Sequence, residues 1–222
     1  MKVCGITTEE DALLSVAFGA DAVGFVFAPG SSRQITPAQA RAITERLPRG
    51  EVLTFGVFRD EHPERVVEIV NTIGLNGAQL HGRESPSEVR YVRKRVPLVV
   101  QAFTAGDPAV DTAGEGPADA LLLDGAHPGS GTTFDWSLAA PVPAGTRLIL
   151  AGGLDADNVG AAIATVRPFG VDVSTGVERA PGRKDPVKLR RFVQAARHAG
   201  LEVASVSTPP LYDWARDGVV DG

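Results

Sequence analysis

The chain has 222 residues, of which 43% are hydrophobic and 22% charged, and its formal net charge is −5. This composition is typical of a folded globular protein and excludes a disordered chain, while the negative charge balance argues against a nucleic-acid-binding surface. The apolar runs are too short for a membrane-spanning helix, and the patterned sequence begins directly after Lys2, which leaves no room for a signal peptide. We therefore expect a cytoplasmic protein that binds neither membrane nor nucleic acid.

The chain repeats one pattern of short apolar runs rich in β-branched residues, each followed by turn residues and a stretch with helical spacing. Such runs indicate β-strands, and their spacing fits one strand, one loop and one helix. The eight candidate strands begin near Lys2, Asp21, Val52, Gly77, Leu98, Asp119, Arg147 and Gly170.

Several helix starts carry a capping residue followed by proline, whose missing amide proton costs nothing at the first helical position. These starts are Thr36-Pro37, Ser85-Pro86 and Asp185-Pro186, and Thr7 with Glu10 fits a capping box for the first helix. Apolar residues then recur at spacings of three and four, which predicts amphipathic helices that pack through one face. In the first helix these residues are Leu13, Leu14, Ala17 and Phe18. The connections after the fifth and sixth strands show weaker helical patterns.

Strands that are apolar on both faces, each followed by a helix, indicate a parallel sheet covered on both sides. Eight such units close most naturally into a barrel, so the predicted fold is α/β, a single (β/α)8 TIM barrel over residues 1–198. Residues 199–222 are expected to form a C-terminal tail that is disordered or lies on the surface. A doubly wound open sheet is the alternative, but its usual G-x-G-x-x-G fingerprint after the first strand is absent.

In such a barrel, catalytic residues gather at the carboxyl ends of the strands. Cys4 follows the first strand and Asp124 the sixth, nearly opposite in the ring, so the two side chains can flank a ligand as a base and an acid. Arg33, in the loop after the second strand, can hold a carboxylate through two parallel hydrogen bonds. Each has a plainer interpretation: Cys4 as a small buried residue, Asp124 as a turn residue, and Arg33 as a solvated loop residue.

The loops after the last two strands fit a phosphate site. Gly152-Gly153 lets a backbone approach a ligand closely, and Ser174-Thr175-Gly176 begins what looks like a short extra helix, whose amide protons favour phosphate. Ordinary turn glycines and a helix cap are the alternative. We expect His81, after the fourth strand, to be a structural histidine and Asp172, in the eighth strand, to orient its neighbours.

The ordered motifs resemble those of the phosphoribosylanthranilate isomerase family of tryptophan biosynthesis, from residue 1 to about residue 198. The resemblance is carried by Lys2-Val3-Cys4-Gly5-Ile6-Thr7, Asp21-Ala22-Val23-Gly24-Phe25-Val26-Phe27, Ser32-Arg33, Gln79-Leu80-His81-Gly82, Leu123-Asp124, Gly129-Ser130-Gly131, Phe134-Asp135-Trp136, Ala151-Gly152-Gly153-Leu154 and Val171-Asp172-Val173-Ser174-Thr175-Gly176-Val177-Glu178. Any one of these motifs alone would be weak, but together they are highly specific.

The resemblance implies an Amadori rearrangement of a small phosphoribosyl substrate, N-(5-phosphoribosyl)anthranilate, with no cofactor and no metal. By matching position, Asp124 is the general acid that opens the ribose ring, Cys4 is the general base that removes the C2 proton, and Arg33 holds the anthranilate carboxylate. The substrate-binding residues are then Arg33, His81, Gly152, Gly153, Asp172, Ser174, Thr175 and Gly176. Thr132 and Thr133 stand where some relatives carry a lysine.

These roles require unusual protonation states, because a free thiol has a pKa of about 8.5 and a free aspartate about 3.9. The acid must therefore have a raised pKa, and raising that of Asp124 to about 7 takes about 4 kcal/mol of differential solvation. Two alternatives remain open: the histidine-pathway isomerase, whose first-strand base is an aspartate, and a non-catalytic phosphosugar-binding or partner-binding protein. The sequence leaves both a monomer and a homodimer open.

Overall fold

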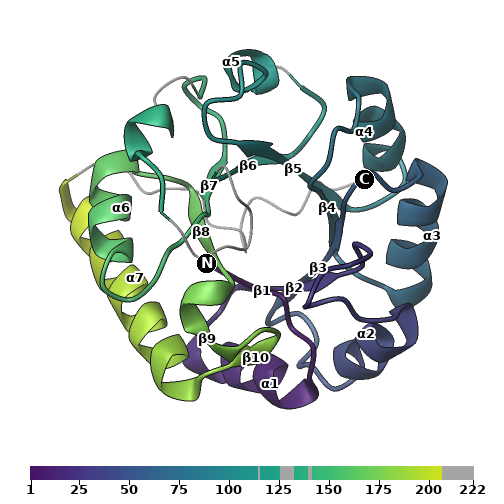
Figure 1. Ribbon diagram of the computed structural model, residues 1–222, viewed down its shortest axis with the longest axis horizontal. Helices are drawn as coiled ribbons and strands as arrows, with labels where there is room; N and C mark the ends of the chain where they lie inside the picture. Colours follow the sequence, from purple (N-terminus) through teal and green to yellow (C-terminus); the bar gives the residue numbers. More distant parts are fainter. Residues whose placement is uncertain (115, 126–132, 140–141, 207–222) are drawn as a thin grey trace.

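The computed structural model describes residues 1–114, 116–125, 133–139 and 142–206. Its eight parallel strands pair in chain order into a closed barrel, and the helices surround it (Figure 1). The strands are β1 (Lys2–Cys4), β2 (Ala22–Val26), β3 (Leu53–Phe58), β4 (Gly77–Leu80), β5 (Leu98–Thr104), β6 (Ala120–Asp124), β7 (Leu148–Leu150) and β8 (Gly170–Val173). The predicted TIM barrel is confirmed, and every strand begins within one residue of its predicted start.

Helices follow the strands, and the segment between β8 and the last helix also holds a hairpin. In chain order, these elements are α1 (Glu9–Phe18), α2 (Pro37–Thr44), α3 (Pro63–Ile73), α4 (Pro86–Arg93), α5 (Val110–Ala113), η1 (Trp136–Ala139), α6 (Val159–Val166), η2 (Thr175–Val177), the hairpin β9 (Glu178–Ala180) with β10 (Arg183–Lys184), and α7 (Pro186–Val206). As expected, the connections after β5 and β6 are the weakest, since α5 and η1 have only four residues each.

The capping predictions hold at three helices and are wrong at α1. Thr36 and Ser85 form capping boxes at α2 and α4, and the Asp185 side chain accepts two amide protons at the start of α7. The cap of α1 is Thr8, whose hydroxyl oxygen accepts the amide proton of Asp11. Thr7 instead donates its hydroxyl proton to the carbonyl of Gly182 in the β9–β10 hairpin, which accounts for the difference of one residue.

The packing face of α1 agrees with the predicted one only in part, since Leu14 and Phe18 pack against the core but Leu13 and Ala17 are exposed. Its buried residues are Asp11, Ala12 and Ser15, whereas Leu13 is 39% exposed. Asp11 is buried because its carboxylate accepts the backbone amide proton of Lys184, so the helix turns a polar group toward the β9–β10 hairpin. A tertiary hydrogen bond therefore adds a polar residue to the packing face, which the apolar spacing of this helix does not predict.

Two apolar layers hold the barrel together. Outward-facing strand residues such as Val23 and Leu150 pack against the helices. Inside the barrel, a smaller cluster fills the interior and comprises Ala22, Phe55, Val100, Ala102, Leu122 and Ala151. Because side chains alternate along a strand, residues two apart share a face, and polar residues near the strand ends are directed into the barrel mouth.

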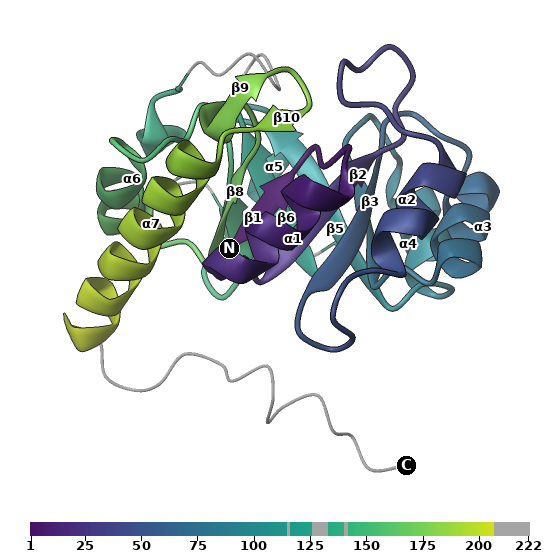
Figure 2. The same cartoon turned by 90° about the horizontal axis from the view of Figure 1, so that it is seen from below.

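The last helix extends past the predicted boundary of the barrel. α7 continues to Val206, beyond the expected end at residue 198. The β9–β10 hairpin lies at the end of the barrel opposite the last turn of α7 (Figure 2). Residues 207–222 lie outside the described residues, so the expected disordered or surface-laid tail stays a prediction. No helix in the described part of the chain is long and apolar enough to span a membrane.

Candidate active site

Cys4 and Lys2 lie side by side inside the barrel, next to Asp172. Lys2 and Asp172 are register partners on β1 and β8, and the Lys2 ammonium donates to Asp172 Oδ1 at 3.0 Å in a buried ion pair. Cys4 is two residues further along β1 and faces Gly24 on β2. A Cβ atom added to Gly24 would lie 2.9 Å from Cys4 Sγ and 3.3 Å from Lys2 Nζ. The missing side chain of Gly24 therefore leaves the room that the thiol and the ammonium share.

The environment of Cys4 has opposing effects on its protonation. Burial raises the pKa of the thiol above its ordinary value, and the Asp172 carboxylate adds to this. The Lys2 and Lys184 ammonium groups oppose the rise, because they favour the thiolate. Burial alone would lower the pKa of Lys2, but Asp172 and Cys4 raise it, so Lys2 stays charged beside the sulfur.

Asp124 ends β6 with its carboxyl group buried. Burial raises the pKa of Asp124 from 3.8 to about 6, although a 2.8 Å hydrogen bond from the Gly125 amide opposes the rise. This shift corresponds to about 3 kcal/mol of preference for the protonated form. A general acid at this position was expected to need a raised pKa, and Asp124 has one.

His81 and Gln79 lie next to Asp124. Burial lowers the pKa of His81 to about 4, helped by Lys2 and Arg59, so the imidazole is neutral at neutral pH. Its Nε2 lies 3.5 Å from Asp124 Oδ2, and its Nδ1 lies 3.0 Å from Gln79 Nε2. If the amide donates to Nδ1, the remaining ring proton is on Nε2 and faces Asp124. Sequence reasoning missed Gln79, although the two-residue alternation along β4 places it on the same face as His81.

The loops after β7 and β8, where a phosphate site was predicted, line one pocket together with the end of β6. Its lining includes Asp124, Gly152, Gly153, Ser174 and Gly176. Gly152 and Gly153 have φ angles of 87° and 64°, which side chains rarely adopt. A Cβ on Gly176 would lie 2.0 Å from the carbonyl oxygen of Leu154, so only glycine lets the two backbones meet.

The short helix predicted after β8 is present as η2, and Ser174 precedes it. The Ser174 hydroxyl is buried and has no hydrogen-bond partner among the residues that the structure describes. The predicted motif Gly129-Ser130-Gly131, together with Thr132, lies outside the described residues.

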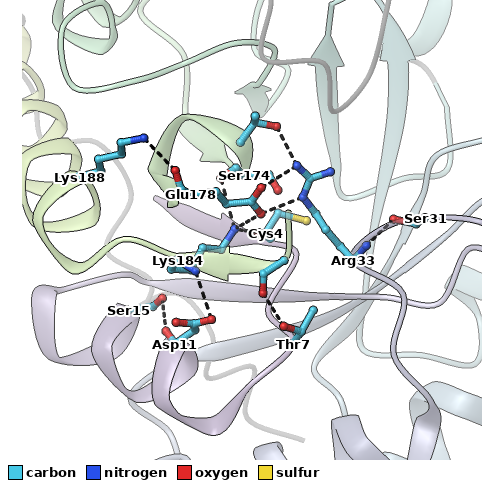
Figure 3. Close-up of polar contacts among 12 residues, drawn as sticks. Cys4, Thr7, Asp11, Ser15, Ser31, Arg33, Ser174, Glu178, Lys184 and Lys188 are labelled. Carbon is cyan, nitrogen blue, oxygen red and sulfur yellow. Dashed lines mark hydrogen bonds and ion pairs between the residues drawn. The ribbon is translucent and has the colours of Figure 1, made fainter. Parts of the chain in front are cut away.

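Arg33 reaches the barrel mouth but already holds a carboxylate of the protein. Its side chain crosses over Gly5, where an added Cβ would lie 2.5 Å from Arg33 Cδ. Nε and Nη2 donate to the two carboxylate oxygens of Glu178 at 2.8 and 2.7 Å, and Nη2 also donates to Thr175 Oγ1 at 3.0 Å. The two parallel hydrogen bonds expected for a ligand are therefore made to Glu178 (Figure 3). Within the described ranges, Nη1 forms no hydrogen bond, and it is the donor left for a ligand.

Glu178 and Lys184 were both missed from the sequence. Although burial opposes ionisation, the Arg33 and Lys184 cations hold the pKa of Glu178 below its ordinary value. Glu178 belongs to the motif after β8, but nothing in the sequence pairs it with a residue of the β2 loop. Lys184 is in a hairpin that the eightfold pattern does not predict.

Comparisons with known proteins agree with this geometry. The family model described as N-(5'phosphoribosyl)anthranilate (PRA) isomerase matches residues 1–195. A protein of Desulforudis audaxviator named N-(5'-phosphoribosyl)anthranilate isomerase is 51% identical over 206 residues, which are 90% of this chain and 98% of the relative. The crystal structure of phosphoribosyl anthranilate isomerase from Thermus thermophilus superimposes with a TM-score of 0.83 at 45% identity, covering 89% of this chain and 98% of that one.

A second solved structure holds a ligand. It is a phosphoribosyl anthranilate isomerase in complex with reduced 1-(o-carboxyphenylamino)-1-deoxyribulose 5-phosphate, and it has a TM-score of 0.78 and 41% identity over 89% of this chain and 97% of that one. The family match covers nearly all of the barrel, and the three relatives described above each exceed 40% identity over at least 97% of their length. The chain therefore belongs to the N-(5'-phosphoribosyl)anthranilate isomerase family.

Proposed function

We propose that this chain carries out its family's reaction, the Amadori rearrangement of N-(5-phosphoribosyl)anthranilate to 1-(2-carboxyphenylamino)-1-deoxyribulose 5-phosphate in tryptophan biosynthesis, with Asp124 as general acid and Cys4 as general base. One observation carries this assignment of roles. A buried carboxyl group whose pKa is raised to about 6 and a thiol beside an ammonium group end two well-separated strands of one barrel mouth. An acid and a base at such positions suit proton transfers at two different atoms of one bound substrate.

The two proton transfers follow one another. Asp124 in its protonated form donates to the ribose ring oxygen, the ring opens, and the nitrogen lone pair forms a Schiff base with C1. The Cys4 thiolate then removes the proton from C2, and the electrons of that bond give the enolamine. The enolamine tautomerises to the ketone, with C1 gaining a proton and the C2 hydroxyl losing one. The reaction is an isomerisation, so no electron acceptor is needed.

His81 supports the acid without carrying charge. A protonated imidazole at 3.5 Å would stabilise the Asp124 carboxylate and lower its pKa, which would make the acid scarce. The lowered pKa of His81, about 4, keeps the ring neutral, so the carboxyl group remains easier to protonate. His81 is therefore a neutral neighbour of the Asp124 carboxyl group that leaves its raised pKa in place.

The two ends of the substrate are held by different loops. The backbone amides of Gly152, Gly153 and the Ser174-Thr175-Gly176 turn hold the phosphate, and Asp172 keeps Lys2 charged inside the barrel. Arg33 binds the anthranilate carboxylate through Nη1, while Glu178 holds the rest of the guanidinium. The working form is a monomer or a homodimer; a solved relative from Thermotoga maritima is described as dimeric.

Turnover of the proposed substrate by the purified chain tests the assignment. Cys4→Ser should keep the fold and the affinity for substrate but lose most of kcat, because a hydroxyl is a far poorer base than a thiolate. Removing a general base typically costs about 100- to 10,000-fold. A Cys4→Ser enzyme with near-normal kcat would exclude Cys4 as the base, and a wild-type chain that turns over only the histidine-pathway substrate would exclude the reaction itself.

A further inference from the structure

Lys184 is a fully buried lysine that reaches three functional segments from outside the barrel. Its ammonium donates to the carbonyl oxygen of Cys4 at 2.6 Å, to Glu178 Oε1 at 3.1 Å and to the carbonyl oxygen of Ser174 at 3.3 Å. The side chain is 0% exposed. Figure 3 shows Lys184 beneath Cys4 and Glu178, with Arg33 on the far side of the Glu178 carboxylate.

The three hydrogen-bond acceptors around Lys184 Nζ require the protonated form of the side chain. Both carbonyls and the Glu178 carboxylate can only accept, so each contact needs a proton from Lys184. A neutral amine has two protons to donate and an ammonium has three. Burial lowers the pKa of Lys184, but the Glu178 carboxylate opposes the loss of the proton. Lys184 is therefore a charged group held in place by its three partners.

The backbone of Lys184 is fixed as well. Its amide donates to Asp11 Oδ2 at 3.2 Å, and this bond joins the β9–β10 hairpin to α1. Asp11 is itself 2% exposed, and the Ser15 hydroxyl donates to its carbonyl oxygen. The lysine is thus held at both ends, so its ammonium has a defined position relative to the strand ends.

The segments that Lys184 joins are those to which the proposed mechanism assigns different tasks. Cys4 ends β1 and carries the base, Ser174 begins the phosphate turn after β8, and Glu178 holds Arg33. Resting on these proposed roles, we propose that Lys184 is a positioning residue for the isomerisation, which sets the base, the phosphate turn and the carboxylate-binding arginine at fixed distances from one another. It touches no reacting atom and acts only through these three groups.

Substituting Lys184→Met keeps the length and apolar stem of the side chain and removes all three hydrogen bonds. We expect kcat to fall about 10- to 100-fold, because a displacement of the base by about 1 Å can cost about 100-fold. We expect KM to rise about tenfold, because Arg33 and the phosphate turn lose their common anchor. The matched control is Lys94→Met, since Lys94 is an exposed lysine at the end of α4 and none of its described contacts is with Cys4, Ser174 or Glu178. It should leave kcat and KM unchanged within about twofold.

A double-mutant cycle with Arg33 separates positioning from a general loss of structure. If Lys184 positions Arg33 through Glu178, Lys184→Met should raise KM by a smaller factor in the Arg33→Ala background than in the wild-type background. A purely structural role predicts the same factor in both backgrounds, and that result would overturn the proposal. So would a folded Lys184→Met enzyme whose kcat and KM match those of the wild type.

Separate control variants distinguish a loss of folding, a failure of the proposed function and a failure of the proposed role of Lys184. If Lys184→Met does not fold, Lys184→Met/Glu178→Gln removes both buried charges. This enzyme is compared with Glu178→Gln instead of the wild type, so that the same two criteria report on Lys184 alone. Cys4→Ser and Arg33→Ala are measured alongside. If these two variants keep wild-type kinetics, the proposed function is wrong; if they lose activity while Lys184→Met keeps it, only the role of Lys184 is wrong.

Discussion

Asp124 Oδ2 lies 3.5 Å from Nε2 of a His81 side chain that is neutral at neutral pH. A buried carboxyl group usually lowers its energy through a cationic partner, but this histidine does not supply one. Burial consequently dominates and raises the pKa of Asp124 to about 6. The acid that the proposed mechanism needs is thus obtained at the expense of folding stability.

Asp124→Asn should therefore stabilise the protein above pH 6. The folded-state pKa of Asp124, about 6, exceeds its ordinary value of 3.8, so its favourable contribution is complete below pH 3.8 and is lost as the pH rises to about 6. Asparagine does not titrate, and its amide oxygen can still accept the Gly125 amide proton. We expect the variant to gain up to about 3 kcal/mol above pH 6 and nothing below pH 3.8. Urea unfolding on both sides of this window measures the difference, and equal stability above pH 6 would contradict it.

The pH dependence of kcat/KM should identify the acid. The productive enzyme has a protonated Asp124 and a Cys4 thiolate, and Asp124 titrates at lower pH than the thiol. The value of kcat/KM should therefore rise up to about pH 6 as thiolate forms, and stay level between the two pKa values. Above the pKa of the thiol it should fall, because the carboxyl group continues to lose its proton while the thiol is already ionised. In Asp124→Asn only the thiol titrates, so the lower activity should rise with pH and then stay level. An alkaline decline that persists in Asp124→Asn would show that another group is the acid.

Lys2→Met should raise the pKa of Cys4 further, because the ammonium that favours the thiolate is lost. Cys4 is the only cysteine of the chain, so the ultraviolet absorbance of the thiolate reports it directly, with Cys4→Ser as the blank. Lys2→Met/Asp172→Asn is the matched control. It also removes the carboxylate that raises the pKa of Cys4, so its shift should be smaller than that of Lys2→Met. Identical thiol titrations in wild type and Lys2→Met would contradict this role of Lys2.

The parts of the fold that follow from local signals were predictable. Strand starts come from short apolar runs, and Thr36 and Ser85 were recognisable as caps because their partners lie three residues away. The alternation of side chains along a strand, with a period of two, also carries information about the site. It places Lys2 with Cys4 and Gln79 with His81, so two members of the site could have been found from their neighbours.

The rest depends on contacts between distant segments. Lys184 lies 180 positions from Cys4, and Glu178 lies 145 from Arg33, and no spacing rule pairs them. The packing face of α1 was predicted only in part for the same reason, since Asp11 is buried by its bond to the Lys184 amide and not by any apolar pattern. Arg33 was expected to use its two parallel hydrogen bonds on a ligand because Glu178 was not recognised as its partner.

Arg33→Ala should raise KM much more than it lowers kcat. The anthranilate carboxylate stays charged and remote from the reacting carbons, so its contact with Arg33 is equal in the ground and transition states and affects binding alone. Losing a charge-assisted hydrogen bond is worth about 1.5 to 3 kcal/mol, or about 10- to 150-fold in KM. Arg33→Lys should recover only part of this, because one ammonium cannot hold both Glu178 oxygens and still present a separate donor to the substrate.

A substrate analogue that lacks the carboxylate tests what Arg33 recognises. Wild type should bind N-(5-phosphoribosyl)aniline poorly, because Nη1 then has no anionic partner, and Arg33→Ala should bind it about equally poorly. Glu178→Gln is the useful comparison, since it keeps the guanidinium but loosens its anchor. This variant should weaken binding of the true substrate and leave the analogue unaffected. If Arg33→Ala weakens the analogue as much as it weakens the true substrate, Arg33 does not read the carboxylate, and its effect on binding must come through Glu178 and the phosphate turn.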